Sequence, residues 1–330
     1  TLLASSAASD VYKRQIMNKW HKFGIAAGIT GSAAFITYLI NRVIFSTSVS
    51  FEVTQTNDRQ IYNWRFGDIS YRVKGSGTPL LLIHDLTPVS GAYEWNKVFD
   101  ELAKDHTVYA IDLIGCGYSS KPSITYTAYL YVQLIEDFIK NVIGRRTDVI
   151  VTGDSAPIVI MACHNNDTLF NKLILINPEN FESCSQIPGK RMNIFRKLLN
   201  TAIIGNSIYN MSVSKNAITE LCQNRLFYSK ASASVINALH ETAHLGGFGA
   251  RHLYASTRCH YTSVNINKAL AAINNSIFII AGDNAVNMEH TIEEYIETNP
   301  VIESAVIPRS RHLPQLERPA RFINQLRIFL

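Results

Sequence analysis

The sequence predicts an α/β protein built on a doubly wound, mostly parallel sheet. Short apolar runs alternate with segments of helical period between residues 49 and 177, and the alternation resumes over residues 271–330. The runs are continuously apolar, which is typical of parallel strands covered on both faces. Residues 178–270 between the two parts have mostly helical patterns, so we expect a helical cap inserted after the sixth strand. Sheets of this kind bind ligands at the carboxyl ends of their strands, where the cap would lie.

The expected elements follow one another in chain order. Before the cap, the strands are "DISYRV", "PLLLIH", "HTVYAIDL", "DVIVTG" and "KLILIN". The helices between them are "YEWNKVFDELAKD", "YTAYLYVQLIEDFIKNVIG" and a segment from Pro157 to about Asn165. After the cap come strand "SIFIIAG", helix "EHTIEEYIETN", strand "IESAVI" and helix "LERPARFINQLRIFL". Helices between successive strands suit the right-handed crossovers of a parallel sheet.

The composition narrows the class of protein. Hydrophobic residues make up 47% of the 330 residues and charged residues 17%. This composition is typical of a globular protein and not of a disordered chain. The net charge of +5 comes from scattered basic residues without interleaved aromatics, so we expect no nucleic-acid partner. The five cysteines form no C-x-x-C pair and indicate isolated thiols, not a disulfide framework or a zinc site. We expect no cofactor.

The N-terminal part predicts a membrane anchor. Residues 1–16 resemble translated adapter sequence, so we expect a non-native leader and a natural start at Met17. Within the predicted anchor, residues 17–48, an uncharged stretch of 18 residues covers 23–40, which is close to the length that spans a bilayer. Basic residues precede this stretch, which weakly favours a cytoplasmic N-terminus and an extracytoplasmic body. Small residues at four-residue spacing (Gly24, Gly28 and Ser32) are compatible with a homodimer that forms through this helix.

Four local motifs resemble those of the α/β-hydrolase fold family, in the family's order. They are "LLLIHDL", "DLIGCGYSSKP", "VTGDSA" and "IPRSRHLPQLERP". The third is similar to the G-x-S-x-G nucleophile elbow, and the fourth to the segment that carries the catalytic histidine. The resemblance implies a serine hydrolase, esterase-like and with a helical cap, in which Ser155 on a strained turn attacks and His312 accepts its proton. The N–H groups of Ala156 and Leu86 would form the oxyanion hole.

Two positions depart from the family pattern. Pro157 replaces the glycine two residues after the serine, and Asp85 replaces the glycine after His84. A carboxylate facing the oxyanion hole would oppose the charge that forms there, so we expect the Asp85 side chain to point away. Dehalogenases and epoxide hydrolases of this fold have an aspartate where Ser155 stands. Asp154 is one position too early to replace it, which argues against both chemistries.

The acid of the triad is the least defined residue. The family usually places it at the position of Ala285, which has no carboxylate. A tightened turn would bring Asp283 into the role, and we predict Asp283 as the acid. Glu179 is the alternative, because some members use the end of the preceding strand, where this chain has Asn177.

Two other functions stay open. The segment "HETAH" contains His240, Glu241 and His244 in the H-E-x-x-H pattern of zinc peptidases, although Ala250 occupies the expected position of a third ligand. A catalytically inactive, ligand-binding protein of the same fold would also explain the two departures. The function we predict is a membrane-anchored serine hydrolase that cleaves an ester-like small molecule through an acyl-enzyme, with an apolar acyl or alcohol group.

Overall fold

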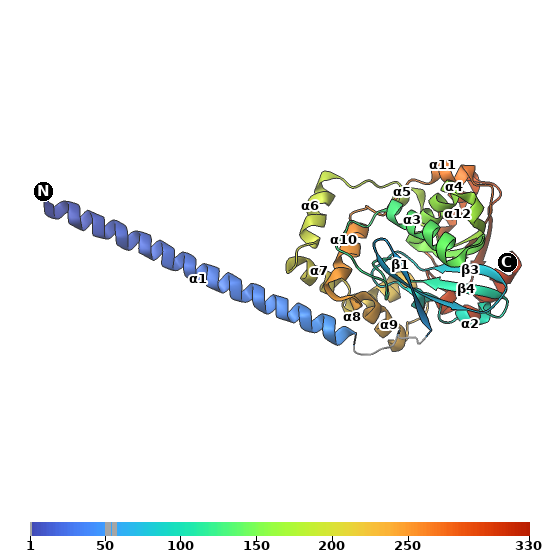
Figure 1. The fold of residues 1–330 in the computed structure, drawn as a ribbon, viewed down its shortest axis with the longest axis horizontal. Coiled ribbons are helices and arrows are strands. Elements are labelled where there is room, and N and C mark those ends of the chain that lie inside the picture. The colour runs from blue at the N-terminus through green and yellow to red at the C-terminus, as the bar shows by residue number, and fades with distance from the viewer. Residues whose placement is uncertain (1, 50–53, 55–57) are drawn as a thin grey trace. The chain divides into compact units, whose positions relative to one another are not determined.

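The computed structural model describes residues 2–49, residue 54 and residues 58–330 (Figure 1). The chain divides into two compact units, residues 1–44 and 45–330. The larger unit contains the whole sheet and the cap and is called the body below.

The body is built on an eight-stranded sheet in the order β1-β2-β4-β3-β5-β6-β7-β8. The hairpin of β1 and β2 is antiparallel, and β2 also pairs antiparallel with β4. All further neighbours pair in parallel, as predicted. The strands are β1 (Arg59–Trp64), β2 (Gly67–Lys74), β3 (Thr78–Ile83), β4 (His106–Ile111), β5 (Thr147–Thr152), β6 (Phe170–Ile176), β7 (Ser276–Gly282) and β8 (Glu303–Ile307). The sequence patterns missed β1, an edge strand in which three of six residues are exposed and one is buried.

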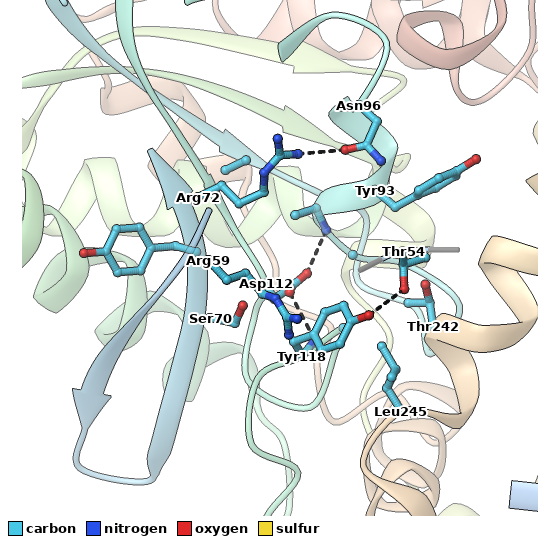
Figure 2. Close-up of a pocket in the computed structure, with 15 residues that line it drawn as sticks. Thr54, Arg59, Ser70, Arg72, Tyr93, Asn96, Asp112, Tyr118, Thr242 and Leu245 are labelled. Carbon is cyan, nitrogen blue, oxygen red and sulfur yellow. Dashed lines mark hydrogen bonds between the residues drawn. The ribbon is translucent and has the colours of Figure 1, made fainter. Parts of the chain in front are cut away.

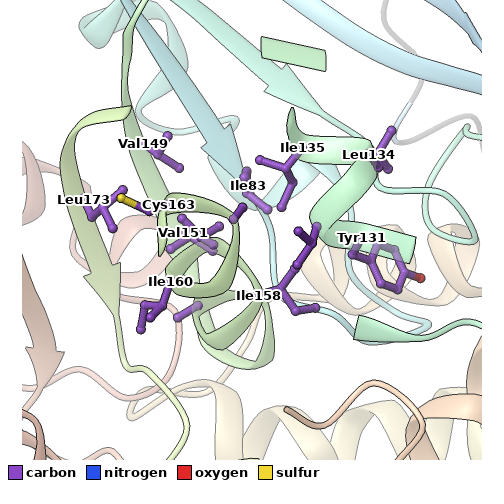
Figure 3. Packing of buried hydrophobic residues seen from close by; sticks show 14 of the residues in the cluster. Ile83, Tyr131, Leu134, Ile135, Val149, Val151, Ile158, Ile160, Cys163 and Leu173 are labelled. Atoms are coloured by element: carbon purple, nitrogen blue, oxygen red, sulfur yellow. The ribbon is translucent and has the colours of Figure 1, made fainter. Parts of the chain in front are cut away.

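Helices cover both faces of the sheet, which explains why the central strands are apolar at most positions. Leu81 and Ile83 of β3 pack into a cluster with α3 (Ala128–Phe138) and α4 (Ala156–Asn165), part of which Figure 3 shows. Leu80 and Leu82, pointing to the other side, pack with α2 (Phe99–Leu102) and α14 (Pro319–Phe329). Because alternate residues of a strand face opposite sides, two covered faces require apolar residues throughout.

The cap follows β6, the sixth strand, as predicted. Its helices pack on one another around Tyr209 and Leu239, which are both buried. After the cap, the chain returns to the sheet through β7, α12 (Met288–Thr298), β8 and α13 (Pro314–Glu317). The helices between β6 and β7 are α5 (Phe181–Cys184), α6 (Lys190–Leu199), α7 (Ile204–Ser212), α8 (Lys215–Leu221), α9 (Ala233–His244), α10 (Arg251–Arg258) and α11 (Asn267–Ala272).

The N-terminal helix α1 (Leu2–Ser48) contains one candidate membrane span, residues 21–48. Its apolar side chains are exposed to solvent, and Phe23 and Ile29 each keep about two thirds of their surface open. The last turns of the helix differ from the rest. Phe45 is 6% exposed and packs against the rings of Tyr209 and Phe248 in the cap, at centroid distances of 6.0 and 5.2 Å. The predicted anchor, which ended at residue 48, therefore includes a residue of the body's core.

We predict that a chain lacking residues 1–44 folds on its own and that Phe45→Ala destabilises it. Removing a buried phenylalanine side chain should lower the free energy of unfolding by about 3 kcal/mol. Ile61→Ala on β1 is the matched control, because Ile61 is 64% exposed and should cost below about 0.5 kcal/mol. Urea denaturation of the truncated chain and of its Phe45→Ala and Ile61→Ala variants measures the two changes in the free energy of unfolding. Equal stabilities of the two variants would show that Phe45 does not belong to the core.

Candidate active site

The sharp turn between β5 and α4 is made by Gly153, not by Ser155. Gly153 has φ of 55°, a left-handed conformation that favours glycine, and it begins the short turn Gly153–Ser155. Ser155 has φ of −79° and ψ of −20°, which is ordinary helical geometry at the start of α4. The expectation of a strained serine is therefore wrong. The backbone places the elbow two residues earlier, at a residue without a side chain.

The structure does not join Ser155 to His312. Ser155 is buried, and its Oγ donates a hydrogen bond to the carbonyl oxygen of His84 at 2.7 Å. The Nε2 atom of His312 instead lies 2.9 Å from Oδ2 of Asp85. The N–H of Ala156 donates a hydrogen bond to the carbonyl of Gly153. It therefore does not point into an oxyanion hole, contrary to the prediction.

Asp85 occupies the centre of the site. Its Oδ1 accepts hydrogen bonds from the backbone N–H groups of Leu86 and Asp154, each at 2.8 Å, while Oδ2 contacts His312. Two N–H groups converging on one oxygen form an oxyanion hole. Leu86 donates to this oxygen from the loop after β3, and the second donor is Asp154 and not Ala156. The expectation that Asp85 points away is wrong, because its own carboxylate fills the hole.

Burial and hydrogen bonding act in opposite directions on the pKa of Asp85. Burial favours the neutral acid and would raise the pKa, but the charge and hydrogen bond of His312 lower it, as do the two N–H donors. The net effect holds the pKa below its usual value. Glu94 lies close by, and burial together with the charge of Asp85 raises its pKa well above the usual range. Asp85 is therefore the group that keeps its negative charge.

His84 and Glu94 hold the loop that carries Asp85. Nε2 of His84 accepts from the N–H of Leu113 at 3.0 Å, so Nδ1 carries the proton and donates to the carbonyl of Asp85 at 2.7 Å. Glu94 accepts from the backbone N–H of Asp85 at 3.1 Å. Burial lowers the pKa of His84, which suits the neutral ring that this pattern requires.

The absent side chain at Gly153 makes room for Asp85. A Cβ atom built on Gly153 would lie 2.4 Å from Oδ1 of Asp85 and 2.9 Å from Nε2 of His312. The space that an elbow side chain would use is therefore taken by a carboxylate from the neighbouring loop. The signal for this exchange is present in the sequence, as aspartate after His84 together with a glycine that can adopt positive φ.

None of the residues considered for the triad acid is hydrogen-bonded to the His312 ring in the part of the chain described. Oδ1 of Asp283 accepts from the N–H of Ser310 at 3.1 Å, so its role is to fix that loop. The side-chain amide of Asn177 donates to the backbone carbonyl of His312 at 2.9 Å and so holds the loop, not the imidazole. Glu179 is hydrogen-bonded to the carboxyl of Asp154. Asp85 is the carboxylate that contacts the ring.

Two cavities adjoin these residues. One, of about 300 Å³, is lined by Asp154, Glu179 and Arg225. The other, of about 100 Å³, shares Glu179 and Arg225 and reaches His312. Five further polar residues line the larger cavity: Ser183, Thr257, His260, Thr262 and Ser263. Its surface therefore differs from the apolar pocket expected for the substrate. A small polar molecule suits this lining better than a long acyl chain.

Figure 2 shows the residues that line a third cavity, which do not include His312. This cavity is too small for a substrate. Its volume of about 30 Å³ holds one or two water molecules. Beside it, the carboxylate of Asp112 accepts from the N–H groups of Ala92 at 2.7 Å and Tyr118 at 3.1 Å. The loop "DLIGCGYSSKP" is thus held together by its first aspartate and has a structural role.

The "HETAH" segment forms the end of α9 inside the cap. The rings of His240 and His244 lie 4.4 Å apart between centroids, and Nδ1 of His244 bonds to the carbonyl of His240 at 2.7 Å. Within the described residues, no group of three or more His, Cys, Asp or Glu side chains could hold a metal ion. The geometry does not support the zinc peptidase alternative.

The chain belongs to the α/β-hydrolase family, whose model matches residues 80–325. An uncharacterized protein of Mycobacterium tuberculosis is 30% identical over 108 residues, which cover 33% of this chain and 31% of the relative. A haloalkane dehalogenase of Agrobacterium fabrum is 45% identical over 53 residues, 16% of this chain and 17% of the relative. A soluble epoxide hydrolase of Corynebacterium sp. is 29% identical over 107 residues, 32% and 37% of the two chains. The alignments therefore span well under half of these relatives.

Solved structures confirm the fold. A serine hydrolase involved in carbazole degradation superposes with a TM-score of 0.69 at 16% identity, covering 82% of this chain and 97% of that one. The carboxylesterase CesB of Bacillus subtilis gives a TM-score of 0.61 at 13% identity, covering 88% and 97%. At these identities the likeness establishes the architecture alone.

We predict that Gly153→Ala destabilises the protein more than Gly144→Ala. Both glycines have positive φ, so both variants should lose about 1 kcal/mol from backbone strain. A Cβ at Gly144 meets no atom within 4 Å, whereas at Gly153 it collides with Asp85. The collision should cost roughly 1–3 kcal/mol more. Equal free energies of unfolding, measured in urea, would mean that the Asp85 carboxylate does not occupy this place.

Proposed function

We propose that this protein is a hydrolase whose reaction centre is the Asp85–His312 pair. The observation that carries the proposal is the position of the Asp85 carboxylate, with Oδ1 between two N–H donors and Oδ2 beside the imidazole. An ionised carboxylate can act as a nucleophile and form a covalent intermediate. Its side chain is 7% exposed and that of His312 is 18% exposed, so a substrate would approach from the histidine side.

In the first step, Oδ2 of Asp85 attacks a carbon atom that bears a leaving group. The carbon–oxygen bond forms as the leaving group departs with its electron pair, which gives an ester of Asp85. In the second step, His312 accepts a proton from water and the resulting hydroxide attacks Cγ of Asp85. Negative charge then develops on Oδ1, which already lies between the N–H groups of Leu86 and Asp154. The intermediate collapses and the product oxygen takes the proton from His312, which leaves Asp85 as the carboxylic acid. Asp85 then releases that proton to water, and the carboxylate is regenerated.

This chemistry suits an electrophilic sp³ carbon, as in an alkyl halide or an epoxide. Two relatives carry names of that kind, the haloalkane dehalogenase and the soluble epoxide hydrolase. The lack of an aspartate at the position of Ser155 does not exclude dehalogenase or epoxide hydrolase chemistry here, because the carboxylate comes from the loop after β3 and not from the elbow.

The acyl-enzyme route on Ser155 remains a proposal for ester-like substrates. It would require Asp85 to leave the oxyanion hole and Ser155 to turn from the His84 carbonyl towards His312. A third function, ligand binding without turnover, is favoured by the glycine at the elbow and by the deep burial of Asp85. We further propose that the part of the apolar stretch 21–48 that precedes Phe45 anchors the protein in a membrane, which its length and hydropathy support.

We predict that turnover in ¹⁸O-water labels the Asp85 carboxylate. Water attacks Cγ in the second step, so one carboxylate oxygen is exchanged in each cycle. The substrates are a panel of terminal epoxides, bromoalkanes and p-nitrophenyl esters, and mass spectrometry of the Asp85 peptide reads the label. His312→Gln should accumulate the ester intermediate, and Ser155→Ala should label as the wild type does.

Three outcomes would overturn the Asp85 mechanism. Turnover without label in Asp85, combined with labelling of Ser155 by a fluorophosphonate probe, would establish the acyl-enzyme route. Turnover that persists in Asp85→Asn would exclude the carboxylate as the nucleophile. Binding of panel members without turnover of any of them would favour the non-catalytic function.

A further inference from the structure

Helix α6 of the cap is attached to the body along one edge only. Eight of its ten residues are exposed, and Leu199 is its one fully buried residue. Arg196, one turn before, donates to Oγ1 of Thr125 at 2.8 Å and lies 4.8 Å from the ring centroid of Tyr261. These two side chains help to fix the helix, and much of its remaining surface is exposed. Figure 1 shows α6 and α7 at the outer side of the body.

About half of the exposed residues of α6 are apolar. Ile194 is 70% exposed, Phe195 and Leu198 are each 39% exposed, and flanking residues extend the surface on both sides. Large exposed apolar side chains gathered on one face usually mark an interaction site. We call this set the cap surface; its members are Ile187, Met192, Ile194, Phe195, Leu198, Ile204 and Met211.

The charge around the cap surface is of one sign. Residues 183–219 contain no aspartate or glutamate and five basic residues. Four of the five are on α6, and three of these, Lys190, Arg191 and Lys197, are exposed. Apolar side chains flanked by lysine and arginine on one helix are typical of helices that lie in the headgroup region of anionic membranes. Each basic residue near such a surface contributes about 1 kcal/mol.

We propose that the cap surface binds the surface of an anionic bilayer, with α6 lying in the plane of the headgroups. A protein partner would need acidic groups to match the basic residues and an apolar groove to cover seven side chains. A bilayer supplies both without a specific fit. The proposal is independent of the reaction at Asp85 and describes a second membrane contact besides the N-terminal helix.

We predict that a fluorophore on Ile194→Cys enters the lipid headgroup region. The five native cysteines are all buried, so an added exposed cysteine can be labelled selectively in the folded protein. The full chain is reconstituted in vesicles of phosphatidylcholine with or without phosphatidylserine, and the lipids carry a nitroxide quencher. Ile328→Cys on α14 is the matched control, because Ile328 is 72% exposed and lies outside the cap surface.

The proposal expects strong quenching at position 194 in anionic vesicles, weak quenching in neutral ones and little at position 328. Replacing Lys190, Arg191 and Lys197 by glutamine should weaken the contact on the order of 100-fold. Three results would overturn it: equal quenching at positions 194 and 328, quenching that is the same in neutral and anionic vesicles, or protection of position 194 in lipid-free detergent that grows with protein concentration. The last result would assign the surface to a second copy of the chain.

Discussion

The carboxylate of Asp85 accepts two backbone hydrogen bonds and pairs with His312, and the arrangement of the site depends on that contact. A buried carboxylate without partners would take up a proton, because burial disfavours its charge. Here the two N–H groups and the imidazole compensate for the lost water. Removing any one of them would leave a buried charge partly unpaired, which costs more than the net value of the contact.

The groups in this contact come from three loops of the fold, and the parallel sheet brings them together. Asp85 follows β3, Asp154 follows β5, and His312 lies on the loop after β8. Carboxyl ends of neighbouring parallel strands meet at one edge, which is where such sheets bind ligands. Asn177 after β6 completes the arrangement, because its amide holds the backbone of the His312 loop. The site is thus assembled by sheet order, and each loop supplies one group.

Much of the fold could be predicted from the sequence, because covered parallel strands require continuous apolar runs and the cap lacks them. The edge strand β1 was missed since exposed strands carry no such signal. Motif order pointed to Leu86 and His312, and the structure has both beside the Asp85 carboxylate. The position of the elbow could not be predicted, because the string G-D-S fits an elbow at the serine as well as one at the glycine. Only the backbone decides between them, and positive φ selects glycine.

The partner of His312 could not be predicted from spacing along the chain. Asp283 and Glu179 follow strands at suitable distances, yet a backbone N–H and a carboxyl group of neighbouring loops hold them. Asp85 was treated as a defect of the oxyanion hole, since a carboxylate there opposes an incoming oxyanion. The same position becomes favourable if Oδ1 is itself the atom on which charge develops. Hydrogen-bond partners across the sheet decide which of these two roles the residue has.

The most direct test of this account is a ¹³C NMR titration of the Asp85 carboxyl group in the wild type and in His312→Gln. A folded-state pKa below the usual 3.8 means that Asp85 stabilises the protein above that pH, and that this stability is lost as the pH falls through the lowered pKa. We expect Asp85 in the wild type to titrate below 3.8. Its pKa should rise in the variant, because the charge of His312 no longer opposes the effect of burial. Titration of the wild-type carboxyl at or above 3.8, or the same pKa in both proteins, would contradict the central pairing of Asp85 with His312.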